Sequence, residues 1–473
     1  MSSIMSTSHN QVPQAPLRTL EKACYGSGSI PFVLAYMALA HLAYPIFNLT
    51  LGMSATLVGV ALAGGRLWDA FTDPMMGYIS DNARTRWGRR RPFILLGALL
   101  CAVGFPLLWS VPTSWSQPSQ FAWILVCILF FYTATTVFSV PWLSLGYEMN
   151  PDPLERTRLQ AWRTYFGAPA ILSLPWIYRI AQMDAFDNTM TGMRWIALFV
   201  GACFLLFSLP VFFGCKERVD ATTLRQEKTP FWQGLRETAS NRPFLVLVGG
   251  IVMPMLCIPM LVSSLAVYIN IYYIFDGDTK TGATYAAAFV SGMFVLKLVI
   301  VPFAVRAVAR YGKIRLVRWA LWLGFFASLG KFVLYTPSAP WLQFINVFPF
   351  AASVTAFWLL VDPMKADCTD YDEWKTGRRR SGTYAAVANW IEKATMTLTL
   401  LGAGLLLDWS GFDPALGGDQ KESTMLVLRA AFALVPASAY VIALFALRAY
   451  PLTEERTAEI REALHTRSTE SDA

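Results

Sequence analysis

The sequence predicts an all-α membrane protein whose twelve transmembrane helices form two six-helix bundles. Composition is the first observation, because 55% of the 473 residues are hydrophobic and only 15% are charged, against about 25% charged in soluble domains. The second is a series of apolar runs along the whole chain, each long enough for the roughly 20 residues that a bilayer requires. The third is a single long polar break, with six apolar runs on either side.

The expected spans follow these apolar runs in order: 24–50, 54–80, 92–111, 120–147, 159–181, 194–214, 243–273, 283–308, 315–335, 341–361, 383–408 and 424–449. They divide the chain into an N-terminal tail (1–23), a first bundle (24–214), a linker (215–242), a second bundle (243–449) and a C-terminal tail (450–473). Because charged residues in the linker alternate with apolar ones, a short amphipathic helix is expected there. The C-terminal tail is expected to be partly helical.

Charge distribution predicts the orientation in the membrane. Lysine and arginine crowd alternate loops, at 84–91, 216–242, 306–318 and 375–380, and the C-terminal tail, whereas the loops at 112–119, 182–193, 274–282 and 409–423 are nearly free of them. Such asymmetry places both termini in the cytoplasm. It also argues that the net charge of +8 does not serve nucleic-acid binding. Short, arginine-rich loops favour a bacterial inner membrane, and the polar first twenty residues do not resemble a cleavable signal.

Two acids inside the second expected span are the strongest functional signal. Asp69 and Asp73 are four residues apart, so a helix places them on one face. Two carboxylates in a hydrocarbon layer are costly without a function or a partner. Arg66 is expected to neutralise Asp69 in part, and a bound sodium ion or proton would relieve the remaining charge. A structural ion-pair brace is the alternative interpretation.

Basic residues deeper in the chain suggest a partner for these acids. Lys393 lies well inside the eleventh expected span, where a lysine costs about 3 kcal/mol. We expect it to bind Asp69 or Asp73 across the bundle interface, with Glu392 or Asp362 as alternative partners.

Hydroxyl and arginine side chains in the fourth and fifth spans could contact a cargo. Thr136 and Ser139 precede Pro141, where hydroxyls and freed backbone groups can bind a cation or a polar substrate; helix-kink packing explains them nearly as well. Arg163 either extends to the interface or faces a cavity. His41 is expected to be a hydrogen-bonded packing residue, and the cysteines are expected to be reduced packing residues.

The cytoplasmic loops contain charges that could lock one conformation. A carboxylate at a helix end beside an arginine-rich loop can form charge-assisted pairs, although a simple topology anchor is also possible. The loop 362–380 could form a two-sided charge lock with the other cytoplasmic loops. The residues expected in these locks are Gly77, Asp81, Arg84, Arg89, Arg90, Asp367, Asp370 and Arg378.

Five sequence blocks together resemble the glycoside–pentoside–hexuronide cation symporter family of the major facilitator superfamily, to which melibiose permease belongs. The blocks are RLWDAFTDPMMG (66–77), TRWGRRRP (85–92), VPWLSLGYEM (140–149), ERTRLQAWR (155–163) and ADCTDYDEWKTGRRRSG (366–382). The resemblance implies the major facilitator fold. It also implies a cation-coupled sugar symporter that works by alternating access and uses no cofactor other than its coupling ion.

Individual roles follow from the positions that match the family. The resemblance implies cation ligation by Asp69, Asp73 and Thr136, and, if the ion is sodium, the two aspartates are its metal ligands. It implies substrate contacts by Arg163, Trp358 and Lys393, with Ser139 nearby. Gly77–Arg91 resembles the superfamily's cytoplasmic gating motif.

Two positions depart from the family pattern. Val33 and Ser139 stand where melibiose permease has carboxylates that hold a galactoside, so galactoside specificity is not implied. The same segment WDAFTDP also resembles the vertebrate lysophospholipid symporters, which makes a lysolipid or other amphiphile the alternative cargo. A membrane enzyme is disfavoured, because the sequence has no metal cluster, nucleophile elbow or phosphate loop. A receptor or scaffold would leave the buried acids and Lys393 without a reason. The expected partners are a small-molecule substrate and the lipid bilayer, with no nucleic acid, and the protein is expected to be a monomer.

Overall fold

The computed structural model describes residues 16–150, 153–217, 238, 241–257, 261–377 and 381–472. Within these ranges the regular elements are helices, without a strand. The all-α prediction is therefore confirmed.

The helices fall into two groups along the chain. The first contains α1 (Thr19–Ser27), α2 (Ser29–Ala43), the π-helix η1 (Tyr44–Thr50), α3 (Ala55–Asn82), α4 (Arg91–Leu108), α5 (Gln117–Glu148), α6 (Pro153–Ala181) and α7 (Thr189–Gly214). The second contains α9 (Arg242–Cys257), α10 (Leu261–Tyr268), the π-helix η2 (Ile269–Ile274), α11 (Thr279–Tyr311), α12 (Lys313–Leu334), η3 (Pro340–Asn346), α13 (Val347–Thr376), α14 (Ser381–Trp409), η4 (Pro414–Leu416), α15 (Glu422–Arg448) and α16 (Glu454–Asp472).

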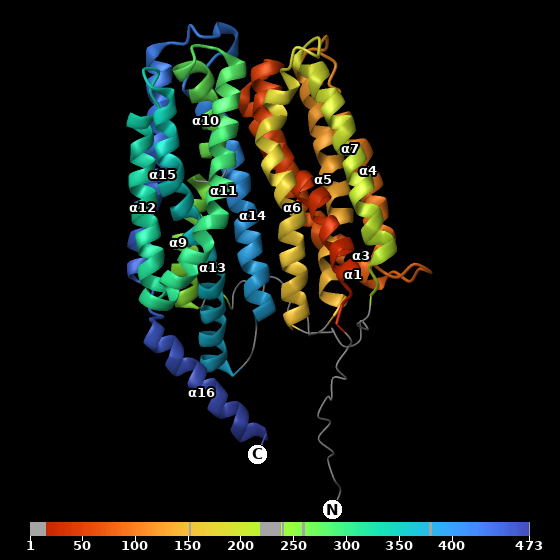
Figure 1. The fold of residues 1–473 in the computed structure, drawn as a ribbon, viewed down its shortest axis with the longest axis vertical. Coiled ribbons are helices and arrows are strands. Elements are labelled where there is room, and N and C mark those ends of the chain that lie inside the picture. The colour runs from red at the N-terminus through yellow and green to blue at the C-terminus, as the bar shows by residue number, and fades with distance from the viewer. Residues whose placement is uncertain are drawn as a thin grey trace, which may run out of the picture.

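The two groups stand side by side as upright bundles, with their helices running up and down in turn (Figure 1). We call them the first half and the second half. The C-terminal helix α16 projects from one end of the molecule, which we call the terminal end (Figure 1). The opposite end, where α3 and α11 begin and α14 finishes, is called the distal end.

The helices agree with the expected spans in most places. Nine helical segments are long and apolar enough to cross a membrane, by composition alone, in the described part of the chain. Helices α3 and α6 cover two further expected spans but are less apolar, because Arg66, Asp69 and Asp73 interrupt the first and Arg163 the second. The expected span 243–273 is divided between α9 and α10, and most of the predicted linker helix lies outside the described residues.

Aromatic packing fills the interior of the first half. Phe105 contacts Phe131 and Phe204 with ring centroids 5.5 Å and 6.0 Å apart, and Trp109 is fully buried beside Phe47. In a membrane such close packing stabilises helix association, because lipid tails are as apolar as the side chains themselves. His41 Nδ1 lies 3.0 Å from the Met37 carbonyl oxygen on its own helix, to which its N–H can donate, and this agrees with the expected packing role. The cysteines with described side chains are free thiols.

Polar contacts between the halves gather toward the distal end. Among described residues, Asp408 of the second half binds Ser54, Ala55 and Thr56 of the first half there. The other cross-half hydrogen bonds and ion pairs at this end are Tyr44–Leu400, Asn48–Tyr268, Trp176–Ser291, Arg179–Thr284 and Asp184–Lys280. Another cross-half contact lies midway along the helices, where Lys393 meets Asp69 and Asp73. The structure thus represents a state that is closed at its distal end.

Candidate functional site

Three helices from both halves converge on the acid pair. Helix α3 places Asp69 and Asp73 one turn apart, α5 contributes Thr136, and α14 contributes Lys393. The Thr136 hydroxyl lies 2.9 Å from Asp69 Oδ1 and 3.0 Å from Asp73 Oδ1. The Lys393 ammonium lies 2.9 Å from Asp69 Oδ2 and also binds Asp73 Oδ2. The expected partner of Lys393 is therefore confirmed.

The Thr136 hydroxyl cannot donate to both aspartates at once. Thr136 has a single hydroxyl hydrogen, yet its oxygen faces one oxygen of each aspartate and also lies 3.2 Å from the Thr72 hydroxyl. Only one of these carboxylate oxygens can accept that hydrogen at a time. Among the groups in direct contact, two carboxylates face one ammonium, which gives these three groups a formal charge of −1. The oxygen-only donor set suits a hard cation such as sodium, or a proton on one carboxyl group.

The environment of the cluster is largely dry. The Asp69 side chain is 7% exposed and the Lys393 side chain 23% exposed, whereas Asp73 is more open at 32%. Charge–charge interactions are stronger here than in water, because the surrounding protein has a low dielectric constant. A cation could therefore reach the cluster past Asp73, the most accessible of its charged groups.

Arg66 interacts electrostatically with Asp69, as the sequence suggested, but the guanidinium forms its direct contacts with other groups. Its fully buried guanidinium donates to the Tyr36 carbonyl at 3.0 Å and lies over the rings of Tyr36 and Tyr132, at 4.4 Å and 5.1 Å from their centroids. Arg66 and Asp69 are three residues apart on α3 and so lie on one face of the helix. The arginine is nevertheless held by cation–π contacts with the two tyrosine rings. Its charge reaches the acid pair only from a distance.

The predicted substrate residues occupy separate positions in the two halves. Arg163 lies over the rings of Phe32 and Trp142, at 4.8 Å and 5.0 Å from their centroids. Ser139 on α5 and Trp358 on α13 are half-buried. Among the predicted substrate residues of the described chain, Lys393 is the one that contacts the acid pair.

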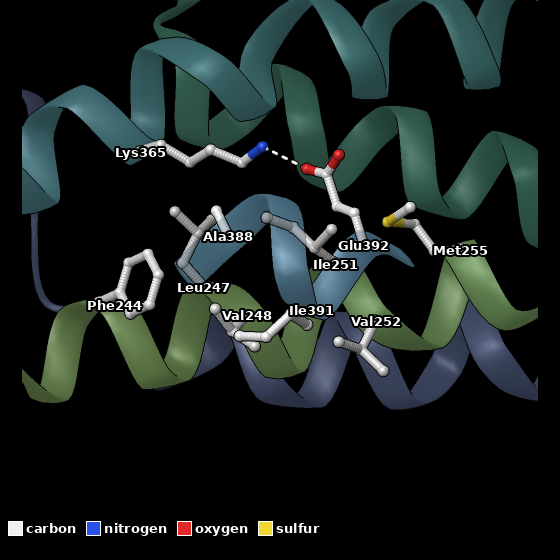
Figure 2. Close-up of a pocket in the computed structure, with 10 residues that line it drawn as sticks. All are labelled: Phe244, Leu247, Val248, Ile251, Val252, Met255, Lys365, Ala388, Ile391 and Glu392. Carbon is white, nitrogen blue, oxygen red and sulfur yellow. Dashed lines mark hydrogen bonds and ion pairs between the residues drawn. The ribbon is translucent and has the colours of Figure 1, made fainter. Parts of the chain in front are cut away.

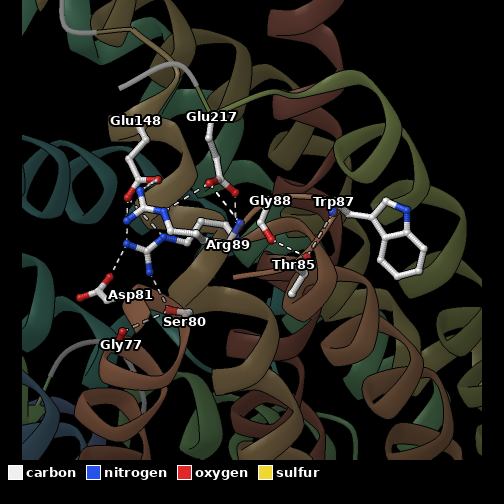
Figure 3. Close-up of polar contacts among 10 residues, drawn as sticks. Gly77, Ser80, Asp81, Thr85, Trp87, Gly88, Arg89, Glu148 and Glu217 are labelled. Carbon is white, nitrogen blue, oxygen red and sulfur yellow. Dashed lines mark hydrogen bonds and ion pairs between the residues drawn. The ribbon is translucent and has the colours of Figure 1, made fainter. Parts of the chain in front are cut away.

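A charged cluster locks the terminal end of the first half (Figure 3). Arg90 binds Asp81 and also Glu148, whose carboxylate lies 2.8 Å from Arg90 Nη2. Arg90 Nη1 donates to Ser80 at 2.6 Å, and Arg89 Nη2 lies 3.1 Å from Glu148. The predicted pairing of Asp81 with the arginine loop is confirmed. Ser80 and Glu148 were missed, although Glu148 is the only charged residue in the sequence of α5.

Glu217 completes this lock from the start of the polar connection between the halves. Its carboxylate accepts hydrogen bonds from the backbone amides of Arg89 at 3.1 Å and Arg90 at 2.7 Å. The preceding Gly88 has a φ of +101°, and a Cβ added there would lie 2.8 Å from Glu217 Oε1. Of the other predicted lock residues, Gly77 offers its carbonyl to Ser80 and Arg84 is exposed.

The second half repeats this arrangement with different residues. Gly312 has a φ of +80°, and Glu454, which follows the last helix of its bundle, accepts from the Ile314 amide at 3.0 Å. Lys313 binds Asp367 on α13, as the arginines bind Glu148 on α5. The segments 84–91 and 309–318 therefore form the same local structure in the two halves.

Asp367 and Asp370 are held within the second half. Arg461 of α16 lies 2.9 Å from Asp367 and 3.5 Å from Asp370. The expected two-sided lock is thus observed only between loops of this half in the described structure, because α16 supplies the second cation. Arg378 lies outside the described residues.

Gly312→Ala is expected to destabilise the protein by about 3 kcal/mol, because its backbone angles (φ +80°, ψ +159°) lie in a region that is essentially restricted to glycine. The added atom would also lie 2.6 Å from Glu454 Oε1 and push this carboxylate away from the Ile314 amide. Gly377→Ala is the comparison, since Gly377 (φ +68°, ψ +9°) lies in the left-handed helical region and nothing lies within 4 Å of the added atom. It should cost only about 1 kcal/mol. Thermal unfolding of the two purified variants measures the difference, and equal losses would contradict the greater strain expected at Gly312.

Glu155 ties the N-terminal segment to α6 at the terminal end. Its carboxylate lies 2.8 Å from Lys22 and 2.6 Å from Arg158, and it accepts from the Leu17 amide at 3.2 Å. Burial acts to raise the pKa of Glu155, but these three partners outweigh it and lower the pKa below its ordinary value of 4.5. The stability that they contribute is therefore present above pH 4.5 and is lost as the pH falls through the lowered value.

Two small pockets with mainly apolar walls lie among the helices. One runs along the apolar face of α9, and Figure 2 shows the ion pair of Lys365 and Glu392 at its rim. Lys365 Nζ lies 2.5 Å from Glu392 and 3.3 Å from Asp362, so these two acids, considered as alternative partners of Lys393, bind Lys365 instead. The second pocket lies between α2 and α6 of one half and α10 and α11 of the other, with His41 and Tyr178 among its lining residues.

Comparisons with known proteins agree with this architecture. Residues 24–454 match the family model described as MFS/sugar transport protein. The chain is 26% identical to the inner membrane symporter YicJ of Escherichia coli, over 95% of each protein. It is 24% identical to the sodium-dependent lysophosphatidylcholine symporter 1 of Gallus gallus, over 97% of this chain and 91% of that protein. A crystal structure of a D-xylose-proton symporter has the same fold, with a TM-score of 0.65 at 13% identity, over 92% of this chain and 98% of that one.

Proposed function

The chain belongs to the MFS/sugar transport protein family, and from this premise we propose that it is a cation-coupled symporter of a sugar or glycoside. It is an integral membrane protein and not an enzyme. The observation that carries the coupling is the bridging of Asp69 and Asp73 by one hydroxyl and one ammonium, which leaves two carboxylates with a single cation in direct contact.

The coupling ion completes the charge balance of this cluster. Sodium or a proton at the Thr136 side would neutralise the remaining carboxylate charge and would weaken the attraction between Asp73 and Lys393. The two halves, 24–214 and 243–449, would then be freer to rock about the linker 215–242. Cation binding and substrate binding favour each other if both stabilise the same arrangement of the halves, because such coupling is reciprocal.

The terminal end is assigned to the cytoplasm and the membrane to the bacterial inner membrane. The arginine-rich loop 84–91 and the basic start of α12 lie at that end, and the positive-inside rule places them in the cytoplasm. When the terminal end opens toward the cytoplasm, the Arg90–Glu148 cluster and the Lys313–Asp367 cluster would each stay intact, because each lies within one half. When the terminal end closes, exposed groups such as Arg84 would approach the acids near Asp370.

The substrate is proposed to lie between the aromatic and basic groups of both halves. Arg163, with its guanidinium over Phe32 and Trp142, offers donors beside an aromatic surface. Trp358, Ser139 and Lys393 supply further ring and polar contacts. Sugars present hydroxyl groups around apolar ring faces, which suits such a combination of donors and aromatic rings.

A lysolipid or another amphiphile is the second candidate cargo, because a pocket with mostly apolar walls lies between the halves along four helices. An acyl chain could enter there from the bilayer. The similarity to a sodium-dependent lysophosphatidylcholine symporter supports the same alternative.

Thermal stabilisation of the purified protein distinguishes the two cargoes. Glycosides, pentosides, uronides and lysolipids would each be added with and without sodium, at two pH values. We expect a sugar to raise the unfolding temperature, and sodium or acid to strengthen its effect, because a bound ligand stabilises in proportion to its occupancy. A response to lysolipids alone would replace the sugar with the amphiphile, and an ion-independent response to every ligand would contradict symport.

A further inference from the structure

We propose that Asp408 is a positioning residue for the cation site, because its carboxylate caps, from the opposite half, the helix that carries Asp69 and Asp73. The inference rests on the alternating-access part of the proposed function. It concerns the distal end, which none of the expected site residues occupies.

The contacts of Asp408 cross the interface between the halves. Asp408 is the penultimate residue of α14, and its Oδ2 lies 2.6 Å from the Ser54 hydroxyl and 2.9 Å from the Thr56 amide. Its Oδ1 lies 3.2 Å from the Ala55 amide. All three donors belong to the start of α3, in the first half.

A carboxylate is well suited to this position. The first amides of a helix have no partner inside the helix, and the aligned peptide dipoles favour a negative charge there. Ser54 is the residue that would normally cap α3, but its hydroxyl is 3.5 Å from the Leu57 amide, which is a long hydrogen bond. The start of α3 therefore depends on α14 for much of its capping.

Close packing holds the two helices in register at the same end. A Cβ added to Gly404 would lie 2.3 Å from the Ala55 carbonyl oxygen, so only glycine permits this approach of the two backbones. The Tyr44 hydroxyl donates to the Leu400 carbonyl at 2.5 Å. Separation of the halves at the distal end must break these contacts together with the Asp408 cap.

The same pair of helices is joined a second time at the cation site. Lys393 lies fifteen residues before Asp408 on α14, which is about 22 Å along a helix. Asp69 lies at a similar distance from Thr56 on α3. The two helices are thus fixed at two points, and a cation at Asp69 and Asp73 weakens only the inner one. The Asp408 cap sets how readily the distal end opens once Lys393 is released.

The ion pair of Lys280 and Asp184 also joins the halves at the distal end, but it is a weaker candidate for controlling how readily that end opens. Lys280 and Asp184 have side chains that are 48% and 92% exposed, and pairs between such exposed groups contribute little. Asp408 is also exposed, so its effect is expected to be moderate, but it accepts three hydrogen bonds and compensates a helix terminus.

The chain offers a closely matched control. Asp278 accepts from the Lys280 and Thr281 amides at 3.0 Å and 3.1 Å and from the Thr281 hydroxyl at 2.6 Å. It is exposed, lies at the distal end and caps α11, as Asp408 caps α3. Asp278, however, belongs to the same half as the helix that it caps. Asp408→Ala and Asp278→Ala therefore remove the same kind of cap, and only the first removes hydrogen bonds that cross the interface.

The test is the distance between spin labels placed on the two halves at the distal end. Unnatural ketone amino acids at the exposed Ser114 and Ser423 would carry the labels and leave the native cysteines unchanged. Without substrate, and with saturating sodium or acid to weaken the inner contact, Asp408→Ala should raise the ratio of long to short distances about fivefold, which corresponds to the loss of one helix cap. Asp278→Ala should leave the ratio at the wild-type value.

A second readout follows from reciprocity between the two contact points. If opening and cation binding favour each other, Asp408→Ala should tighten cation binding by up to the same factor, and Asp278→Ala should not. An unchanged distance ratio in Asp408→Ala, or an equal change in both variants, would overturn the proposal. If Asp408→Ala does not fold, Ser54→Ala removes one of the three contacts and decides the question through the same ratio. If the distance ratios change as predicted but the protein transports no ligand, the positioning role of Asp408 is supported and the proposed symport is wrong.

Discussion

Asp69→Asn and Asp73→Asn are each expected to abolish the accumulation of substrate against a gradient while the protein remains folded. Each substitution removes the charge that a coupling cation compensates, so the cation no longer changes the affinity for substrate. Coupling of this kind typically changes affinity by about 5- to 150-fold, and the factor should fall to about one in both variants. Uptake into proteoliposomes, with and without an ion gradient, measures it.

Asp184→Asn is the control for the loss of a carboxylate in general. Asp184 binds Lys280 at the distal surface and its side chain is 92% exposed, so gradient-driven uptake should stay near the wild-type level. Gradient-driven accumulation that survived in both Asp69→Asn and Asp73→Asn would show that the coupling cation binds elsewhere.

Lys393→Met is expected to make folding stability depend strongly on the coupling ion. Without the ammonium, two largely buried carboxylates face each other, and removing one partner of a buried pair costs about 3–5 kcal/mol. A sodium ion or proton can replace the lost charge, and the ammonium no longer competes with it. The unfolding temperature of Lys393→Met should therefore be low in ion-free buffer and rise steeply with sodium or acid, more steeply than that of the wild-type protein.

Lys365→Met tests whether this dependence is specific to the site. Lys365 also bridges two acids, Glu392 and Asp362, but neither belongs to the cation cluster. Its loss should lower the unfolding temperature without a comparable ion response. Equal ion responses in the two lysine variants would assign the effect to general charge screening.

The sequence was sufficient for the fold class and for the centre of the site. Apolar runs and the polar break predicted two helical groups, and two acids four residues apart in an apolar helix predicted the charged cluster. Lys393 could be assigned to the acids before the structure was known, because a lysine at membrane depth needs a partner. Thr136 came from the family resemblance, since a hydroxyl beside a proline is equally typical of helix packing.

Contacts that depend on how helices are placed were not predictable. Glu148 and Glu217 reach the arginine loop from other parts of the chain, and Asp408 looked like an ordinary residue at a helix end. Arg66 was assigned to Asp69 by helix spacing, but the rings of Tyr36 and Tyr132 from neighbouring helices hold it. Helix periodicity gives the face of a residue, whereas the partner on that face comes from tertiary packing.

The central claim is that one cation binds between Asp69 and Asp73, and direct ion titration of the purified protein tests it. Sodium would be titrated at constant pH by calorimetry, and protons would be titrated in sodium-free buffer while their uptake is recorded. The account predicts one saturable ion per protein chain in the wild type and none in the Asp69→Asn, Asp73→Asn double variant. Binding that is unchanged in the double variant, or absent from the wild type for both ions, would contradict it.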